Sequence, residues 1–284
     1  MKKVLVTGAT GFIGKYVIEE LKKREIEIIA TSKDESKARE SNWLMGLTYI
    51  PFNLGDLNDK INYQQFFNNP DLVIHLAWDG LPNYQSDHHL TRNLPNHFNF
   101  ISNLIRHHQK DITITGTCFE YGMQEGPLSE DMDTKPANAY AIAKDKLRRK
   151  LEELQHGYPF SMKWVRLFYM YGEGQSPSSL FSQLTSALER GDEVFNMSGG
   201  QQIRDFLPVE KVAEYIVSIA LQQRVHGIIN CCSGIGTRVI TFIRDYLAKV
   251  NKTIELNLGY YPYSALEPME FWGTTNRLKK IIHG

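Results

Sequence analysis

A glycine-rich turn near the start of the chain constrains the fold more than any other feature. Residues 4–14 read Val-Leu-Val-Thr-Gly-Ala-Thr-Gly-Phe-Ile-Gly, so three apolar residues precede Gly8, Gly11 and Gly14. From Phe12 onward, apolar residues recur at helical spacing with charged residues between them. A strand, a glycine-rich turn and a helix in this order predict a site for the pyrophosphate of a dinucleotide. The alternative is a βα turn that binds nothing.

Each glycine has its own expected role in such a turn. Gly8 allows the tight turn, Gly11 lets the backbone approach a phosphate, and Gly14 lets the helix pack against the strand. The helix N-terminus adds free N–H groups and a partial positive charge, which favour an anionic ligand.

The composition excludes several classes of partner. The 284 residues include 42% hydrophobic and 23% charged residues, and 32 basic side chains balance 32 acidic ones. Because no block of like charge is present, we expect neither nucleic acid nor a membrane as partner. No apolar run has membrane-spanning length, and the start Met-Lys-Lys-Val leaves no room for a signal peptide. Cys118, Cys231 and Cys232 lack metal-ligand spacing, so we expect a cytoplasmic protein with reduced thiols and no metal.

Short apolar segments alternate with helical patterns along the chain, which predicts an α/β fold with a doubly wound parallel sheet. The helices expected on its faces include 86–109, where Pro95 predicts a kink or a late start, and 138–154. The expected strands are 4–6, 26–30, 47–52, 71–77, 112–117, 164–168 and 228–232.

Beyond Gly172 the elements become short and mixed, which predicts a smaller α+β lobe over the carboxyl edge of the sheet. We expect residues 1–166 to form the dinucleotide domain, with 205–232 returning to it. Residues 167–204 and 233–284 would then form the substrate lobe.

The end of the second expected strand bears on the choice of dinucleotide. NAD-binding units usually place an acid there, about twenty residues beyond the glycines, to hold the ribose 2′-hydroxyl. This chain has Ser32 and Lys33 at that point, and its first carboxylate is Asp34. A hydroxyl and an ammonium, with Lys37 and Arg39 nearby, suit a 2′-phosphate, so NADP(H) is favoured and NAD(H) stays possible.

Polar residues also follow the third and fourth expected strands. Asn53-Leu54 closes the third, where the amide could meet the adenine amino group, and Trp78 begins a loop after the fourth. His75 lies inside the fourth strand and is expected in the core. The remaining histidines of this region show no metal-site spacing and are interpreted as surface or interface residues; they are His88, His89, His97, His107 and His108.

Three further residues predict the chemistry. Tyr140 and Lys144 are four residues apart on an expected helix, so their side chains share one face. A tyrosine has a pKa of about 10 in water, and a nearby ammonium favours the phenolate and lowers that pKa. Thr117, at the end of an expected strand, could hydrogen-bond the same substrate oxygen. The three would hold a carbonyl beside a nicotinamide and move its proton while hydride is transferred.

Six motifs between residue 4 and residue 209 together resemble the extended short-chain dehydrogenase/reductases, specifically the NAD-dependent epimerase/dehydratase group that acts on nucleotide sugars. They are Thr7 to Gly14, His75-Leu-Ala77, Thr117 four residues before Tyr121-Gly122, Tyr140-xxx-Lys144, Arg166 to Gly172, and Arg204 to Val209.

The resemblance implies a role for each matched residue. Thr117, Tyr140 and Lys144 fall on the catalytic triad, and Arg204 falls on an arginine that binds the pyrophosphate of the substrate. The alternative for Arg204 is an ion pair with Asp205 or Glu210. Residues implied in cofactor binding are Gly8, Gly11, Phe12, Ile13, Gly14, Ser32, Lys33, Asn53, Leu54, Leu76, Ala77, Trp78, Tyr140 and Lys144. Those implied in substrate binding are Asp79, Cys118, Glu120, Tyr169 and Arg204.

Departures from the family pattern narrow the expected reaction. Sugar 4,6-dehydratases carry Asp-Glu directly after the threonine, where this chain has Cys118 and Phe119, and Glu120 is one residue too late. Reductases that also epimerise carry a cysteine where Phe119 stands. Tyr169 replaces a usual asparagine, and the tip of the second strand lacks the acid typical of 4-epimerases.

We therefore expect an NAD(P)H-dependent reductase that transfers hydride to the C4 keto group of a nucleotide-activated 4-keto-6-deoxysugar, as in surface polysaccharide synthesis. The reductases that make dTDP-fucose or CDP-abequose have similar short motifs. One alternative is a nucleotide-sugar 4-epimerase with tightly bound NAD, and another is an inactive dinucleotide-sensing regulatory protein. The helices at 86–109 and 138–154 resemble the family's dimer-forming pair, so a homodimer is expected.

Overall fold

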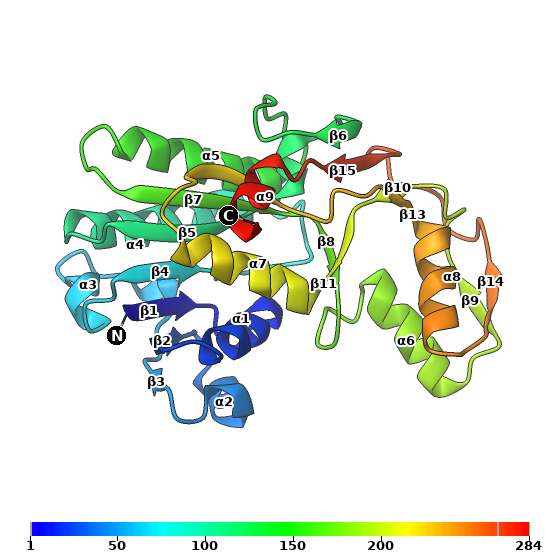
Figure 1. Cartoon of the computed structure of the whole chain (residues 1–284), viewed down its shortest axis with the longest axis horizontal. Coiled ribbons are helices and arrows are strands. Elements are labelled where there is room, and N and C mark those ends of the chain that lie inside the picture. Colours follow the sequence, from blue (N-terminus) through cyan, green and yellow to red (C-terminus); the bar gives the residue numbers. More distant parts are fainter. Residues whose placement is uncertain (1, 266, 284) are drawn as a thin grey trace.

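The computed structural model describes residues 2–265 and 267–283 and has a parallel β-sheet at its centre (Figure 1). Every expected strand of this sheet is present, and the α/β class with a doubly wound sheet is confirmed. The strand order is β12-β7-β5-β4-β1-β2-β3, and every neighbouring pair is parallel. The bounds are β1 (Lys2–Thr7), β2 (Ile26–Thr31), β3 (Thr48–Tyr49), β4 (Leu72–His75), β5 (Asp111–Thr117), β7 (Ser161–Leu167) and β12 (Gly227–Cys231).

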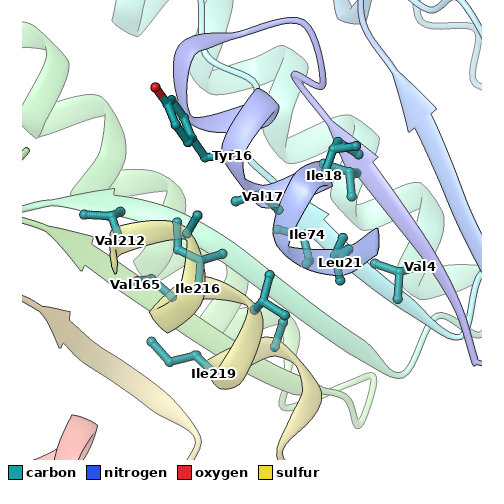
Figure 2. Close-up of a cluster of buried hydrophobic side chains, with 14 of the residues drawn as sticks. Val4, Tyr16, Val17, Ile18, Leu21, Ile74, Val165, Val212, Ile216 and Ile219 are labelled. Carbon is teal, nitrogen blue, oxygen red and sulfur yellow. The ribbon is translucent and has the colours of Figure 1, made fainter. Parts of the chain in front are cut away.

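One face of the sheet is covered by α1 (Phe12–Lys22), α7 (Val209–Leu221) and α9 (Asn276–Ile282). Because strand side chains alternate between faces, Val4 and Val6 point to this side. Figure 2 shows apolar side chains of α1 and α7 meeting over the strands. Burial of this apolar surface stabilises the layer, at about 25 cal/mol per Å² removed from water.

The opposite face is covered by α3 (Tyr63–Phe66), α4 (Leu94–Arg106) and α5 (Ala139–Leu154). A single π-helical turn, η3 (His89–Asn93), precedes α4, and Pro95 lies in the first turn of α4. The late start predicted from Pro95 is therefore confirmed, since proline is tolerated in a first turn, where N–H groups have no intrahelical partner.

A second lobe lies beyond the carboxyl edge of the sheet, at the right of Figure 1. It contains α6 (Leu180–Arg190), β9 (Val194–Asn196), α8 (Val239–Lys249) and β14 (Glu255–Asn257). Apolar residues of these elements form a hydrophobic cluster of their own, centred on Leu184 and Ile243. The domain boundaries at 166, 205 and 232 stay a prediction. Among the described residues, no helix combines the length and apolarity that a membrane span requires.

Short elements connect the sheet to this lobe or extend the edge of the sheet. Three two-stranded pairs are β6 (Gly126–Leu128) with β15 (Phe271–Gly273), β8 (Tyr169–Tyr171) with β11 (Phe206–Pro208), and β10 (Ile203–Arg204) with β13 (Thr237–Arg238). The remaining short helices are α2 (Glu35–Glu40), η1 (Asn42–Leu44), η2 (Leu54–Asp56) and η4 (Cys118–Tyr121).

Candidate active site

The glycines of the turn between β1 and α1 allow a close approach of backbone segments that side chains would prevent. Gly8 has φ +71°, and a Cβ on it would lie 2.8 Å from the backbone nitrogen of Ala77. A Cβ on Gly14 would overlap the carbonyl oxygen of Gly8. Gly11 is the N-cap of α1, and no side chain caps the helix there. The first N–H groups of α1 therefore suit an anionic group, as a dinucleotide pyrophosphate requires.

A cleft of about 910 Å³ opens at this turn, along the carboxyl ends of β1, β2 and β4. Many residues predicted to bind the cofactor line it, whereas Ile13, Gly14, Tyr140 and Lys144 do not. Those that do are Gly8, Gly11, Phe12, Ser32, Lys33, Asn53, Leu54, Leu76, Ala77 and Trp78. Its size and its glycine floor fit a dinucleotide.

The side chains at the end of β2 are already paired. Ser32 Oγ lies 2.9 Å from the Tyr49 hydroxyl, and Lys33 Nζ donates to Asp79 Oδ2 at 2.8 Å. The Lys33 ammonium lowers the pKa of the Asp79 carboxyl. Asp79, predicted to contact the substrate, lines the cleft at the glycine-rich turn, and its contact with a substrate stays a prediction. Asp34 is occupied too, since its side chain caps α2 by accepting from the backbone N–H of Lys37.

The predicted triad lies together behind one wall of the cleft. Thr117 ends β5 and Tyr140 is in the first turn of α5, near enough for the Thr117 side chain to favour the ionised form of Tyr140. One turn later, Lys144 Nζ donates to the carbonyl of Thr115 at 2.7 Å. All three side chains are buried, with at most 8% of each residue exposed.

Burial controls the proton affinities of this pair. It lowers the pKa of Lys144 from its ordinary 10.5 to about 7, because the charged form loses hydration. It raises the pKa of Tyr140, and the neighbouring Thr117 side chain opposes this only in part. Desolvation is the largest cause of this rise, and the lowering of the Tyr140 pKa by Lys144 stays a prediction.

Trp78 forms the wall between the cleft and the triad. Lys144 Nζ lies 4.0 Å from the centre of its ring, and the Tyr140 ring meets it edge-on at 5.8 Å. On its other partners, the indole stacks on His97 at 4.5 Å and donates to His89 Nδ1 at 3.2 Å. A lysine over an indole is a cation–π contact, so Trp78 helps to hold Lys144 in place.

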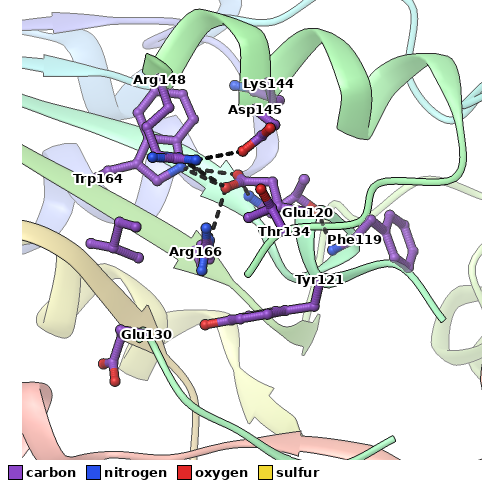
Figure 3. Close-up of polar contacts among 12 residues, drawn as sticks. Phe119, Glu120, Tyr121, Glu130, Thr134, Lys144, Asp145, Arg148, Trp164 and Arg166 are labelled. Carbon is purple, nitrogen blue, oxygen red and sulfur yellow. Dashed lines mark hydrogen bonds and ion pairs between the residues drawn. The ribbon is translucent and has the colours of Figure 1, made fainter. Parts of the chain in front are cut away.

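Glu120, predicted to contact the substrate, has protein partners for its carboxylate in the structure. It is fully buried, and its carboxylate accepts from the Thr117 backbone N–H, from Trp164 Nε1 at 2.9 Å and from Arg166 Nε at 2.8 Å (Figure 3). With Thr117 it forms a capping box at the start of η4. Glu120 thus fixes the end of β5, and with it the position of Thr117.

The predicted substrate residues Tyr169 and Arg204 do meet, through a residue that the sequence did not indicate. The Tyr169 hydroxyl donates to Glu267 Oε2 at 2.6 Å, and Arg204 Nη2 donates to the same oxygen at 3.0 Å. Neither Asp205 nor Glu210 pairs with Arg204 in this arrangement. Cys118 is buried nearby, and burial with the charge of Glu267 raises the pKa of its thiol.

Two histidines expected at the surface or an interface are buried inside the protein instead. His89 is fully buried, and His97 has 2% of its surface exposed, whereas His75 is a core residue as predicted. Helical spacing could have indicated that His97 is buried, because His97 lies on the same face of α4 as the apolar Phe100 and Ile101. Among the described residues, no group of three or more His, Cys, Asp or Glu side chains is arranged to hold a metal ion.

Comparison with known proteins decides the family. The NAD dependent epimerase/dehydratase family matches residues 4–232, from the first strand of the sheet to its last. The chain belongs to this family of enzymes. The match includes the glycine turn, the triad and Arg204, so the motifs compared above lie within the matched region.

Individual relatives in this family act on nucleotide sugars. A dTDP-6-deoxy-L-talose 4-dehydrogenase (NAD(+)) from Aggregatibacter actinomycetemcomitans is 27% identical over 95% of this chain and 98% of its own length. CDP-abequose synthase from Salmonella typhimurium is 25% identical over 88% and 80%. Among solved structures, a UDP-glucose-4-epimerase from Stenotrophomonas maltophila with bound NAD superposes with a TM-score of 0.87 at 17% identity, covering 100% and 93%. That likeness concerns the fold.

Proposed function

We propose that this enzyme interconverts a hydroxyl and a keto group at carbon 4 of a nucleotide-activated 6-deoxysugar, acting as a reductase of the 4-keto sugar. A 4-dehydrogenase and a 4-keto reductase catalyse one step in opposite directions. The observation that carries the proposal is that Tyr140 is buried next to Thr117, one helical turn before the buried Lys144. A bound nicotinamide dinucleotide would supply or accept the hydride.

The residues of the chain would handle the proton. Tyr140, whose pKa is raised by burial, is held as the neutral phenol and so can donate a proton to an oxygen that gains negative charge. Thr117 would orient the same oxygen by a second hydrogen bond. Lys144, next to the active tyrosine and with a pKa of about 7, can then return a proton at neutral pH.

The hydrogen-bond partners of Glu120 favour a reduction of the keto group over an elimination of water. Elimination needs an additional acid and base beside the carbonyl, and family dehydratases carry Asp-Glu after the threonine. Cys118 and Phe119 occupy those positions here, and the carboxylate of the next residue, Glu120, is engaged by Arg166 and Trp164.

The nucleotide part of the substrate is proposed to bind at Arg204. Its guanidinium is a forked donor suited to a diphosphate. It lies at the junction with the second lobe, with its charged end 4.9 Å from the centre of the Phe271 ring.

We further propose that the enzyme prefers NADPH. Support comes from Lys33 and Lys37, which both line the cleft, although Asp34, which caps α2 through one carboxylate oxygen, lines it too. Against this stands the NAD(+) in the name of the talose relative. The test is the ratio of kcat/KM with NADPH to kcat/KM with NADH. If the enzyme prefers NADPH, the double variant K33A/K37A should lower this ratio at least tenfold.

The main experiment follows absorbance at 340 nm with dTDP-4-keto-6-deoxyglucose and either NADPH or NADH. We expect turnover in the parent, and a fall in kcat of about 10²–10⁴-fold in Y140F, because the proton donor is lost. Tyr158→Phe, at an exposed tyrosine, serves as the matched control. Absence of turnover with 4-keto sugars of any nucleotide would reject the proposal.

A 4-epimerase is the second candidate, because relatives include a UDP-glucose 4-epimerase from Neisseria meningitidis at 26% identity. It would copurify with NAD and interconvert UDP-glucose and UDP-galactose without net change at 340 nm. An inactive dinucleotide sensor, by contrast, would bind cofactor equally in the parent and Y140F, and neither would turn over any substrate.

A further inference from the structure

Two buried histidines and a threonine form a hydrogen-bonded chain that joins three elements below the cleft. Thr7 Oγ1, at the end of β1, lies 2.9 Å from His75 Nδ1 at the end of β4. His75 Nε2 lies 2.7 Å from His97 Nδ1 on α4. Both ends of the chain, Thr7 and His97, line the dinucleotide cleft. Among the described residues, Nε2 of His97 has no hydrogen-bond partner.

Both imidazoles are neutral, so each ring carries a single N–H proton. Burial lowers the pKa of His75 to about 3 and the pKa of His97 well below its usual range, and the nearby Lys144 adds to both effects. A neutral imidazole has one N–H and one acceptor nitrogen. A histidine that accepts a hydrogen bond at one ring nitrogen therefore carries its proton on the other nitrogen and donates from there.

Two arrangements of donors and acceptors satisfy the hydrogen bonds of this chain. In the first, the Thr7 hydroxyl accepts the N–H of Ala77 at 3.3 Å and donates to His75, so His97, which lines the cleft, carries its proton on Nε2. In the second, the N–H of Ala77 still donates to Thr7, but His75 donates to Thr7 and His97 donates to His75, so Nε2 of His97 carries no proton. A dinucleotide presents mainly acceptor oxygens, in its phosphates and riboses, so it favours the first arrangement.

We infer that His97 is a dinucleotide-binding residue that donates its Nε2–H to a ribose or phosphate oxygen, while His75 and Thr7 are positioning residues that fix its tautomer. Stacking on Trp78 at 4.5 Å, with 23° between the ring planes, also fixes the plane of the imidazole. A donor that is rigid before binding loses little conformational freedom when the ligand arrives. This inference rests on dinucleotide binding in the cleft and not on the sugar substrate.

Equilibrium binding tests the donor. We expect His97→Phe, which keeps an aromatic ring on Trp78 but removes the N–H, to weaken NADH and NADPH binding about tenfold. His97→Gln retains an N–H at similar reach and should stay within about threefold of the parent. His156→Phe, at an exposed histidine in a turn, is the control. Equal affinity of the parent and His97→Phe for both dinucleotides would overturn the inference.

Fragments locate the acceptor oxygen. A loss of affinity of His97→Phe for AMP would assign the oxygen to the adenosine half. A loss for ADP-ribose but not for AMP would assign it to the pyrophosphate or the second ribose. Either result supports the inference, because the same N–H is the donor in both.

Nitrogen NMR of ¹⁵N-histidine-labelled protein tests the tautomer directly. In the NADH complex we expect His97 as the neutral Nε2–H tautomer, with its Nε2 signal shifted on binding, in both the parent and Y140F. Because Y140F removes turnover but not the cleft, this readout is independent of the proposed reaction. An Nδ1–H tautomer or a charged His97 in the complex would contradict the inference.

Discussion

At the scale of single residues, the fold of the glycine-rich turn depends on positions that carry no Cβ atom. Gly14 shows this, because a Cβ there would overlap the backbone of Gly8 and Ala9. We expect Gly14→Ala to lower the free energy of unfolding by about 1–3 kcal/mol or more and to abolish dinucleotide binding, since the turn must open to admit a methyl group.

Urea denaturation and a dinucleotide titration measure the two effects of Gly14→Ala. Gly157→Ala is the matched control, because a Cβ at Gly157 meets nothing within 4 Å. Equal stability of the two variants would show that α1 can shift away from β1 at little cost.

Lys144 is predicted to make stability depend on pH. Because its pKa is about 7 in the folded protein and 10.5 ordinarily, the unfolded chain binds more protons between these values, so stability rises with pH. Below about pH 7 both states are protonated and the cost of burying the ammonium is constant.

We expect the free energy of unfolding of the parent to rise by up to about 1.4 kcal/mol per pH unit more than that of Lys144→Met between pH 7.5 and 9.5. Lys146→Met, on the exposed side of α5, should follow the parent. Parallel curves for the parent and Lys144→Met would mean that Lys144 keeps its charge throughout this range.

At the scale of elements, the sequence predicted the features that depend on residues close together in the chain. The glycine turn, the strands of the sheet and the pairing of Tyr140 with Lys144 on one face of α5 follow from local spacing. Glu120 illustrates what does not, because its partners Trp164 and Arg166 are 44 and 46 residues away. Likewise, the place of His97 depends on β4, which is 22 residues away at His75. Such pairs form only once strands and helices pack.

The buried pair of Glu120 and Arg166 connects β7 to η4 (Figure 3). We expect Glu120→Gln to cost about 3–5 kcal/mol of unfolding free energy, because the fully buried Arg166 loses its compensating charge. Thr117 would also lose its fixed position, so kcat should fall. The measurement is urea denaturation.

Glu35→Gln provides the comparison for this prediction, since Glu35 pairs with Arg39 in solvent and exposed ion pairs contribute about 0–1 kcal/mol. A similar small effect in Glu120→Gln would imply that water reaches Arg166 when its partner is neutral.

At the scale of the whole molecule, the two lobes meet at Arg204, whose charge is already balanced by Glu267. A nucleoside diphosphate that binds there would encounter a carboxylate of like charge. If Arg204 binds diphosphate as proposed, Glu267→Gln should tighten binding of dTDP or UDP about tenfold, or ~1.4 kcal/mol, by isothermal titration calorimetry. Glu255→Gln, in β14 of the second lobe, is the control. Weaker binding in Glu267→Gln would instead make Glu267 a support for Arg204.

The oligomeric state belongs to the same scale. The pair α4 and α5, predicted to form a dimer interface, packs on one face of the sheet. Light scattering of the purified protein tests the homodimer prediction.

The path of the chain through its two lobes also has a consequence for synthesis on the ribosome. The edge strand β12 joins β7 only after α6 and β9 of the second lobe have been made, and α9, which packs on α7 and β12, follows after α8. Until then β7 is the open edge of a nascent sheet, and the apolar surface that α9 later covers faces solvent. Unpaired strand edges and exposed apolar surface favour aggregation. Slow translation between residues 168 and 227 would therefore lower the yield of soluble protein, a vulnerability that lies in the order of assembly.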